Sequence, residues 1–151
     1  MRNPETKFSA PVKTAFLARA PRMVIDTSAL AAILLGEPER KPLIEHILQA
    51  EAKRIAAANS LETGTVLERR RGEAAGREFD LFVVRAKLEV FPVDAEQGET
   101  ARSAWRQYAK GRHAAGLNFG DCFAYRLAKF SGQKLLAKGG GFRLTDAELV
   151  P

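Results

Sequence analysis

The sequence predicts an α/β fold with a central, mainly parallel β-sheet flanked by helices. Short apolar segments with the character of buried strands alternate with longer segments whose apolar residues recur at helical spacing, and this alternation favours parallel strands joined by helices. The chain has 151 residues, of which 46% are hydrophobic. A chain of this size can bury a core of its own, so we expect one folded domain.

Four segments have the character of strands. The first, 23–25, is an apolar run that ends at a carboxylate, which is typical of a buried strand. The second, 54–58, is weaker because alanine has little β preference. The third, 90–93, contains Pro92, which suits an edge strand or a strand end. The last strand is predicted over 134–138.

Helices are predicted between these strands, where apolar residues recur at intervals of three and four. Asn59 or Ser60 should cap the third helix, and Gly36 and Gly132 should end the first and the last. The predicted helices cover residues 29–35, the region around 43–48, 59 or 60 to about 71, 73–87, 94 to about 110, and 119–130.

The charge and the cysteine content restrict the function and the compartment. The formal net charge of +6 suits a polyanionic partner such as nucleic acid, although basic globular proteins are common and charge alone does not identify a function. Cys122 is the only cysteine, so the chain has no intrachain disulfide and no thiolate cluster for zinc, and we expect a reducing cytoplasm. The longest apolar run, 29–35, is too short to cross a membrane.

Residues 1–22 do not fit the alternating pattern. They carry basic residues, but their only apolar run, 15–18, is too short for the apolar core of a signal peptide. We expect an N-terminal extension that is disordered or results from a misassigned start codon, with Met23 as the first residue of a compact domain over 23–151. Deleting residues 1–22 should then leave the fold intact.

Four carboxylates follow predicted strands or begin predicted helices. Asp26 and Asp94 come directly after strands, Glu62 falls in the first turn of a helix, and Asp121 begins a late helix. In a parallel sheet, ligands bind at the carboxyl ends of the strands, so these groups would converge if their strands share one sheet. Clustered carboxylates repel unless a cation separates them, and Mg²⁺ or Mn²⁺ suits oxygen ligands. Such a metal can polarise a phosphoryl oxygen and activate water.

Each of these carboxylates also has a structural interpretation. Glu62 and Asp121 each stand three residues after an asparagine, which is the spacing of a capping box. Asp94 precedes a glutamine by the same interval, and Asp26 can cap the helix that follows it. Taken singly, each is more typical of a helix cap than of a catalytic group. Only their joint placement favours a metal site, and their spacing leaves both interpretations open.

Several stretches combine these carboxylates with characteristic neighbours. They are MVIDTSAL at 23–30, NSLET at 59–63, VLERR at 66–70, KGRHAAGLNFGDCFAY at 110–125, LL at 135–136 and KG at 138–139. In this order and spacing they resemble PIN-domain ribonucleases, and specifically the VapC toxins of type II toxin–antitoxin systems. The resemblance covers residues 23 to about 148, and the run through Asp121 is its most specific part.

The resemblance implies a PIN fold and an endonuclease that cleaves RNA with Mg²⁺ or Mn²⁺, leaving 5′-phosphate and 3′-hydroxyl ends. It also implies inhibition by a cognate VapB antitoxin, whose basic side chain would block the acidic pocket, and usually a homodimer. By position, Asp26 and Asp121 would be metal ligands, and Glu62 would be a third acid that binds the metal directly or through water. Thr27 and Ser28 would support the site by hydrogen bonds to Asp26 or to a metal-bound water.

The chain departs from the family pattern in one place. Relatives of this subtype commonly carry an acidic residue or two between the Lys-Gly and the Phe of the last motif, whereas residues 139–141 here are all glycine. Asp146 matches a Thr-Asp that relatives often have, so either Asp146 supplies a fourth acid or the site works with three. We expect weaker metal binding than in relatives with the full set, and Gly141→Asp would test this.

Other polar and aromatic residues receive less specific predictions. We expect Arg112, in the loop before Asp121, to contact an RNA phosphate or the antitoxin. Residues 69–71, all arginine, are typical of a solvated helix end, His113 of a surface histidine, and Cys122 of a small buried residue. The spacing of four aromatic residues indicates core or dimer interface before base stacking: Trp105, Tyr108, Phe123 and Phe130.

The main hypothesis is therefore a metal-dependent endoribonuclease toxin, and two alternatives stay open. One is a phosphatase with Asp26 as the nucleophile, although such sites often have a second aspartate at the position of Ser28. The other is a catalytically weakened module that binds RNA or antitoxin, which the glycine run at 139–141 keeps open. The RNA target is not evident from the sequence.

Overall fold

A four-stranded parallel sheet forms the centre of the protein in a computed structural model that describes residues 20–151. The strands lie in the order β3-β2-β1-β4, and every neighbouring pair is parallel. The strands are β1 (Arg22–Ile25), β2 (Ala52–Ala56), β3 (Leu88–Phe91) and β4 (Lys134–Leu136). The helices are α1 (Thr27–Leu34), α2 (Arg40–Gln49), α3 (Ala57–Arg71), α4 (Glu73–Arg85), α5 (Ala95–Tyr108) and α6 (Phe119–Ser131), followed by a short 3-10 helix, η1 (Gly141–Leu144).

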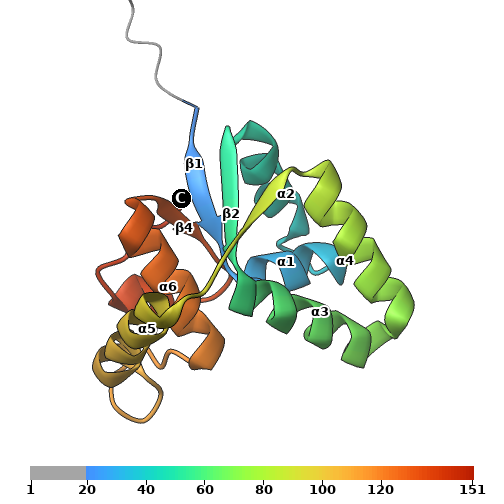
Figure 1. Ribbon diagram of the computed structural model, residues 1–151. Helices are drawn as coiled ribbons and strands as arrows, with labels where there is room; N and C mark the ends of the chain where they lie inside the picture. The colour runs from blue at the N-terminus through green and yellow to red at the C-terminus, as the bar shows by residue number, and fades with distance from the viewer. Residues whose placement is uncertain (1–19) are drawn as a thin grey trace, which may run out of the picture.

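Helices cover both faces of the sheet (Figure 1). Successive side chains of a strand point to opposite faces, and β1 divides its residues accordingly. Met23 and Ile25 pack in the core formed with α1 to α4, whereas Val24 packs in the core formed with α5 and α6. All three side chains are buried, as expected for an interior strand of a parallel sheet. The predicted α/β class with a parallel sheet is confirmed.

The strand boundaries differ from the sequence prediction by about two residues. β2 and β3 both begin two residues earlier than predicted, and β4 ends two residues earlier. Parallel pairing sets these limits, because Arg22 pairs with Ala52 and Lys53 pairs with Leu88. Pro92 follows the edge strand β3, which is one of the positions that the sequence predicted for it.

The predicted cap of the third helix is wrong. α3 begins at Ala57, directly after β2, and its N-cap residue Ala56 makes no side-chain hydrogen bond. Asn59 therefore lies inside the helix, and Glu62 falls in its second turn and not in its first. The predicted ends at Gly36 and Gly132 agree with the structure, in which both glycines have positive φ and follow the last helical residues.

The N-terminal boundary can be compared only in part. Residues 1–19, where most of the predicted extension falls, lie outside the described residues. The sheet includes one residue before Met23, because Arg22 belongs to β1 and pairs with Ala52. In addition, Glu51 N donates to Pro21 O at 2.8 Å. Within residues 20–151, no helix has the length and apolar character needed to span a membrane.

Candidate active site

Three predicted acidic residues meet at the carboxyl edge of the sheet. Asp26 directly follows the interior strand β1, Glu62 lies on α3, and Asp121 is the third residue of α6. After burial, which is the largest cause, the charges of Asp121 and Glu62 raise the pKa of Asp26, and the charge of Glu62 also raises that of Asp121. We call Asp26, Glu62 and Asp121 the acidic trio. Its catalytic role remains a prediction.

Asp26 is the most deeply buried of the three, with 1% of its surface exposed. Its Oδ2 accepts a hydrogen bond from Ser28 N at 2.9 Å, which caps α1, while the buried Oδ1 has no hydrogen-bond partner. Burial, and then the charge of Asp121, raise the pKa of Asp26 to about 7. The carboxylate is therefore costly to ionise in this position without a cation beside it.

Glu62 is held by two polar side chains from different parts of the fold. Its Oε2 accepts from Thr27 Oγ1 at 2.5 Å and from Asn59 Nδ2 at 3.3 Å. Glu62 also lies against Gly120, where an added Cβ would come within 2.2 Å of Oε2. Position 120 therefore has no room for a side chain while Glu62 keeps this conformation.

Asn59 links the elements that carry the acidic trio. Its side chain is fully buried, and Nδ2 approaches Thr27 Oγ1, Glu62 Oε2 and, at 3.0 Å, the Gly120 carbonyl oxygen. The amide thus joins α1, α3 and the first turn of α6. The spacing of Asn59 to Glu62 fits a capping box and therefore predicts a helix cap at Asn59. The interval of three residues correctly indicates that Asn59 and Glu62 are close together. It does not indicate the contacts of Asn59 with Thr27 and Gly120, which are distant in the sequence.

Asp121 combines a structural and an electrostatic role. Asn118 N donates to its Oδ2 at 2.9 Å, and Asp121 N donates to Asn118 Oδ1 at 2.8 Å, which completes the predicted capping box. Burial raises the pKa of Asp121, and the charge of Glu62 raises it further, against the lowering effect of the Asn118 N–H. The two interpretations of this residue therefore coexist: it caps a helix and belongs to the acidic trio.

The two residues after Asp26 occupy different positions around the trio. The Ser28 N–H contacts Asp26, and Ser28 Oγ accepts from Lys138 N at 2.9 Å, which ties the segment after β4 to α1. Thr27 Oγ1, predicted to hydrogen-bond Asp26 or a metal-bound water, donates to Glu62 Oε2 in this structure. Lys138 Nζ pairs with Glu37 and, at 3.4 Å, with Glu39.

The residue arrangement fits a hard divalent cation. Asp26 and Asp121 each use Oδ2 to accept a backbone N–H, Asp26 Oδ1 is buried without a partner, and both pKa values are raised. A bound cation would give Asp26 Oδ1 a partner and would offset the cost of ionising both carboxylates. Among residues 20–151, no group of three His, Cys, Asp or Glu side chains stands close enough to form a direct metal-binding set. Mg²⁺ is often held in proteins by one or two carboxylates that are completed by water.

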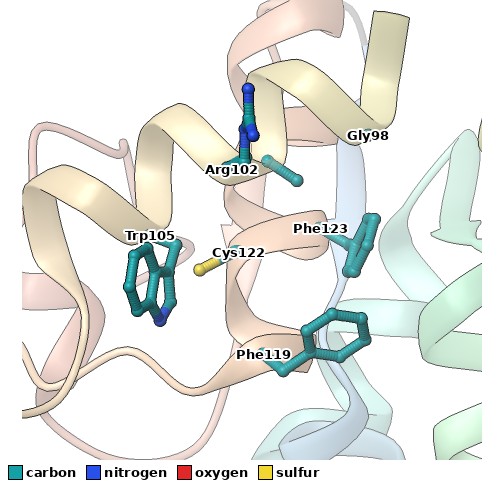
Figure 2. Close-up of a pocket in the computed structure, with 7 residues that line it drawn as sticks. Gly98, Arg102, Trp105, Phe119, Cys122 and Phe123 are labelled. Atoms are coloured by element: carbon teal, nitrogen blue, oxygen red, sulfur yellow. The ribbon is translucent and has the colours of Figure 1, made fainter. Parts of the chain in front are cut away.

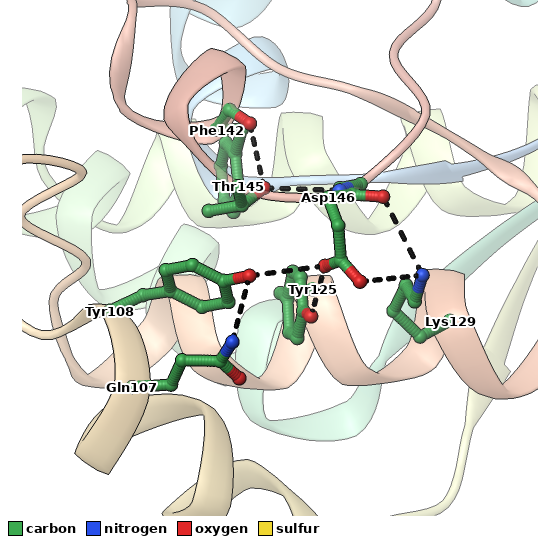
Figure 3. A network of polar contacts seen from close by, with 8 residues as sticks. Gln107, Tyr108, Tyr125, Lys129, Phe142, Thr145 and Asp146 are labelled. Atoms are coloured by element: carbon green, nitrogen blue, oxygen red, sulfur yellow. Dashed lines mark hydrogen bonds and ion pairs between the residues drawn. The ribbon is translucent and has the colours of Figure 1, made fainter.

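Asp146 lies in a separate network (Figure 3). Its Oδ1 accepts from Tyr125 Oη at 2.5 Å and from Tyr108 Oη at 3.4 Å, and its Oδ2 pairs with Lys129 Nζ at 3.1 Å. Tyr125 and Lys129 stand one and two turns further along α6 than Asp121. The hydrogen bond from Tyr125 and the pairing with Lys129 lower the pKa of Asp146. The structure does not bring Asp146 to the acidic trio.

The three glycines that replace the expected acid are not equivalent. At Gly141 an added Cβ would lie 2.6 Å from the Ala115 carbonyl oxygen, and Gly139 has φ +99°. Gly140 has φ −101°, and an added Cβ there meets nothing within 4 Å. A carboxylate can therefore be accommodated at position 140 but not, without rearrangement, at 141.

The remaining predicted residues take structural positions. Arg112 stacks over the Trp105 ring, with 4.3 Å from Cζ to the ring centroid. Asp94 is exposed and caps α5 by accepting from Gln97 N at 2.8 Å, as its structural interpretation predicted. Cys122 is buried, and burial followed by the charge of Asp121 raises its pKa to about 11, so the thiol is not an activated nucleophile.

Comparison with known proteins decides the family. The family model of the PIN domain matches residues 23–148, which is most of the chain. The chain belongs to the PIN-domain family. This PIN domain is 53% identical over 128 residues to a ribonuclease VapC of Mycolicibacterium smegmatis, an alignment that covers 85% of this chain and 99% of the relative. The predicted resemblance to PIN-domain VapC proteins is confirmed.

Solved structures share the fold of this PIN domain. VapC20 of Mycobacterium tuberculosis, described as a Sarcin-Ricin loop cleaving toxin, superposes with a TM-score of 0.71 at 21% identity, covering 85% of this chain and 98% of VapC20. A toxin–antitoxin complex from Klebsiella pneumoniae gives a TM-score of 0.62 at 14% identity, covering 85% of this chain and 96% of the other. At these identities the likeness concerns the fold.

Proposed function

We propose that the chain is the ribonuclease toxin of a type II toxin–antitoxin pair and cleaves RNA phosphodiester bonds with a divalent metal. The acidic trio carries this proposal. Three carboxylates lie at the carboxyl edge of a PIN fold, and the most buried of them has an unpaired oxygen and a pKa raised to about 7. The relative at 53% identity, which is named a ribonuclease, supports the choice of RNA as the substrate.

Asp26 and Asp121 would hold the metal, which we take to be Mg²⁺ or Mn²⁺. Their Oδ1 atoms are the natural ligands, because each Oδ2 accepts a backbone N–H. Glu62 would act through a water molecule, since Thr27 and Asn59 already bond its Oε2. When bound, the ion would polarise a phosphodiester oxygen and make a water more acidic for in-line attack. Glu62, held from two sides, would orient that water.

The proposal includes an antitoxin partner. The raised pKa values of Asp26 and Asp121 mean that a nearby positive charge would stabilise their ionised forms. A basic side chain of a VapB-type antitoxin would therefore bind at the acidic trio in place of metal. The toxin–antitoxin complex among the structures with this fold supports a partner of this kind. We further propose a homodimer that acts in the cytoplasm. An antitoxin complex that left Asp26 and Asp121 open to solvent would contradict the mode of inhibition.

RNA cleavage by matched variants tests the proposed activity. Asp26→Asn should reduce cleavage by at least about 100-fold, the lower range for loss of a catalytic group. Asp94→Asn is the control, because Asp94 also caps a helix after a strand but is exposed and outside the trio. The antitoxin-free protein is assayed on RNA with Mn²⁺ and with chelator. Equal cleavage by wild type and Asp26→Asn would overturn the mechanism, and intact RNA with wild type at excess metal would favour a binding module.

A further inference from the structure

The glycine run at 139–141 begins beside Asp26. Asp26 N donates at 2.9 Å to the carbonyl oxygen of Leu136, the last residue of β4. Lys138 N donates to Ser28 Oγ at 2.9 Å, and Ser28 N donates to Asp26 Oδ2. The segment that enters the run is therefore hydrogen-bonded to Asp26 directly and through Ser28.

The run ends beside the loop that leads to Asp121. At Gly141 an added Cβ would lie 2.6 Å from the Ala115 carbonyl oxygen, so the two backbones are in close contact. Phe142, the next residue, is 4% exposed and packs in the same core as Ala115. Ala115 stands in the loop just before Asn118, which forms the capping box with Asp121. The run therefore connects the surroundings of two members of the acidic trio.

The run has no side chain with which to fix its own path. Glycine has the widest range of backbone conformations, so ordering it costs more conformational entropy than ordering any other residue. An added Cβ at Gly139 or Gly140 would meet nothing within 4 Å, so neighbouring atoms do not enclose these two residues. The position of the run must therefore be set at its ends, and Lys138 is the last side chain before it.

The Lys138 side chain is held by the turn between α1 and α2, residues 35–39. Its Nζ pairs with Glu37 and, at 3.4 Å, with Glu39. Glu37 also faces Arg70 near the end of α3, with 4.0 Å between Oε1 and Nη1. The Glu37 side chain is 27% exposed and that of Lys138 is 36% exposed. A single exposed ion pair contributes little, but several charges in a partly buried network can hold a side chain in place.

Glu37 is itself well anchored. Its N–H donates to Ala32 O at 2.9 Å, and its carbonyl oxygen accepts from Arg40 N at 3.0 Å. Pro38 follows directly, and a proline restricts the backbone of the residue before it as well as its own. The main chain at Glu37 is thus held from both sides, so its carboxylate is a fixed support for Lys138.

We propose that Glu37 is a positioning residue for the metal site. With support from Glu39, it holds the Lys138 side chain. Lys138 in turn fixes the start of the glycine run and keeps its N–H on Ser28, whose own N–H orients the Asp26 carboxylate. Glu37 acts through these residues and not by contact with metal or RNA. This inference rests on the proposed function for the metal.

Hydrogen exchange tests the contact without metal. The amide exchange rate of Lys138 is measured by NMR in the full-length protein with chelator, for wild type and Glu37→Gln. Glutamine keeps the size of glutamate but loses its charge, so the Lys138 amide should exchange about fivefold faster, which matches the upper range for an exposed ion pair. The buried Leu127 amide in α6 should exchange at the same rate in both proteins. An unchanged rate at Lys138, or equal acceleration at Leu127, would overturn the proposal.

Mn²⁺ affinity, measured by isothermal titration, tests the consequence. Glu37→Gln should weaken binding by about tenfold, the lower range for loss of a group that orients a metal ligand. Lys138→Gln separates positioning from simple charge. Removing a cation near the site would tighten Mn²⁺ binding if only charge mattered, whereas loss of positioning weakens it. Both single variants should therefore weaken binding, and effects in opposite directions would contradict the positioning role.

Glu99→Gln is the matched control, because it removes the same charge from another exposed ion pair. Glu99 pairs at 2.9 Å with Arg102 of α5, which borders a hollow between α5 and α6 (Figure 2). None of the residues that line this hollow belongs to the acidic trio or to the glycine run. The Lys138 exchange rate and the Mn²⁺ affinity should both be unchanged. A loss of affinity equal to that of Glu37→Gln would show that any lost carboxylate has this effect, and the proposal would fail.

The outcomes separate this inference from the proposed function. If wild type binds Mn²⁺ and cleaves RNA but Glu37→Gln does both equally well, only the positioning role fails. If Glu37→Gln and Lys138→Gln both weaken Mn²⁺ binding but wild type leaves RNA intact, the positioning role stands and the ribonuclease proposal fails. If wild type does not bind Mn²⁺, both fail.

Discussion

Asp26 and Asp94 have the same local setting in two different regions of the molecule. Each follows a parallel strand and caps the next helix. Asp26 accepts from Ser28 N at 2.9 Å, and Asp94 accepts from Gln97 N at 2.8 Å. Their surroundings differ, because Asp26 is 1% exposed whereas Asp94 lies in solvent.

The difference comes from the position of the strand in the sheet. β1 lies between β2 and β4 with helices on both faces, so the carboxylate at its end is buried and feels the charges of Glu62 on α3 and Asp121 on α6. β3 is an edge strand, and the helix after it begins at the margin of the fold. A helix-capping aspartate therefore becomes a candidate metal ligand only where the tertiary structure buries it beside other carboxylates.

The largest expected contrast is in the pH dependence of stability without metal. The pKa of Asp26 is about 7 in the folded protein, well above the value of about 4 that is usual for an aspartate in an unfolded chain. Because the folded value is the higher one, the stability linked to this group is fully present below the unfolded value and is lost as pH rises through 7. At about 1.4 kcal/mol for each unit, the loss is on the order of 4 kcal/mol.

Urea unfolding in the presence of chelator, at pH values between the unfolded pKa and the folded pKa of about 7, measures this loss of stability. Wild type and Asp94→Asn should lose stability together as pH rises, whereas Asp26→Asn should lose much less because its side chain does not ionise. An Asp26→Asn curve parallel to wild type would show that the buried carboxylate is not the group responsible.

The next contrast concerns the amide that ties the acidic edge together. Asn59→Ala leaves Glu62 and the Gly120 carbonyl without their buried donor, so the free energy of unfolding should fall by about 2 kcal/mol. Gln97→Ala, beside Asp94 on the surface, should stay within about 0.5 kcal/mol. Denaturant unfolding compares them, and equal effects would mean that Asn59 does not hold the region of Asp26 together.

The third contrast concerns metal affinity at the acidic trio, and whether an acid in the glycine run at 139–141 would increase it. Gly140→Asp should tighten Mn²⁺ binding by about tenfold, the scale of one supporting group at a metal site. Gly141→Asp is the wrong variant for this purpose, since its Cβ would lie 2.6 Å from the Ala115 carbonyl oxygen and should destabilise the fold. Isothermal titration with Mn²⁺ measures the affinity, with Asp94→Asn as the unchanged control. An unaltered Kd in Gly140→Asp would show that the acid absent from this loop does not matter.

The smallest expected effect is at Asp94 itself. Asp94→Ala removes a helix cap and should lower the free energy of unfolding by about 1 kcal/mol, whereas Asp94→Asn keeps a capping oxygen and should be nearly neutral. Thermal unfolding compares the two. RNA cleavage should be unchanged in both, and a marked loss of cleavage would place Asp94 in the site after all.

Local patterns in the sequence are enough to predict the order of elements and much of the local chemistry. Apolar runs and helical spacing predicted the alternating α/β pattern, and side-chain spacing predicted the caps at Asp94 and Asn118. These features depend on residues within a few positions of one another, which is the range that a sequence pattern reports. The resemblance to PIN domains added the choice of Asp26, Glu62 and Asp121 from among many acidic residues.

Long-range packing determines how those acids are held and which residues contact them. The partners of Asn59 lie 32 and 61 residues away in the chain, so its local spacing to Glu62 suggested a cap and concealed a bridge. The motif alone suggests that Asp146 joins the trio. In the structure its carboxylate instead accepts a hydrogen bond from Tyr125 and pairs with Lys129, both on α6. Burial and the closeness of other charges arise from long-range contacts. Those contacts make Asp26 a buried member of the acidic trio, whereas Asp94 remains an exposed helix cap.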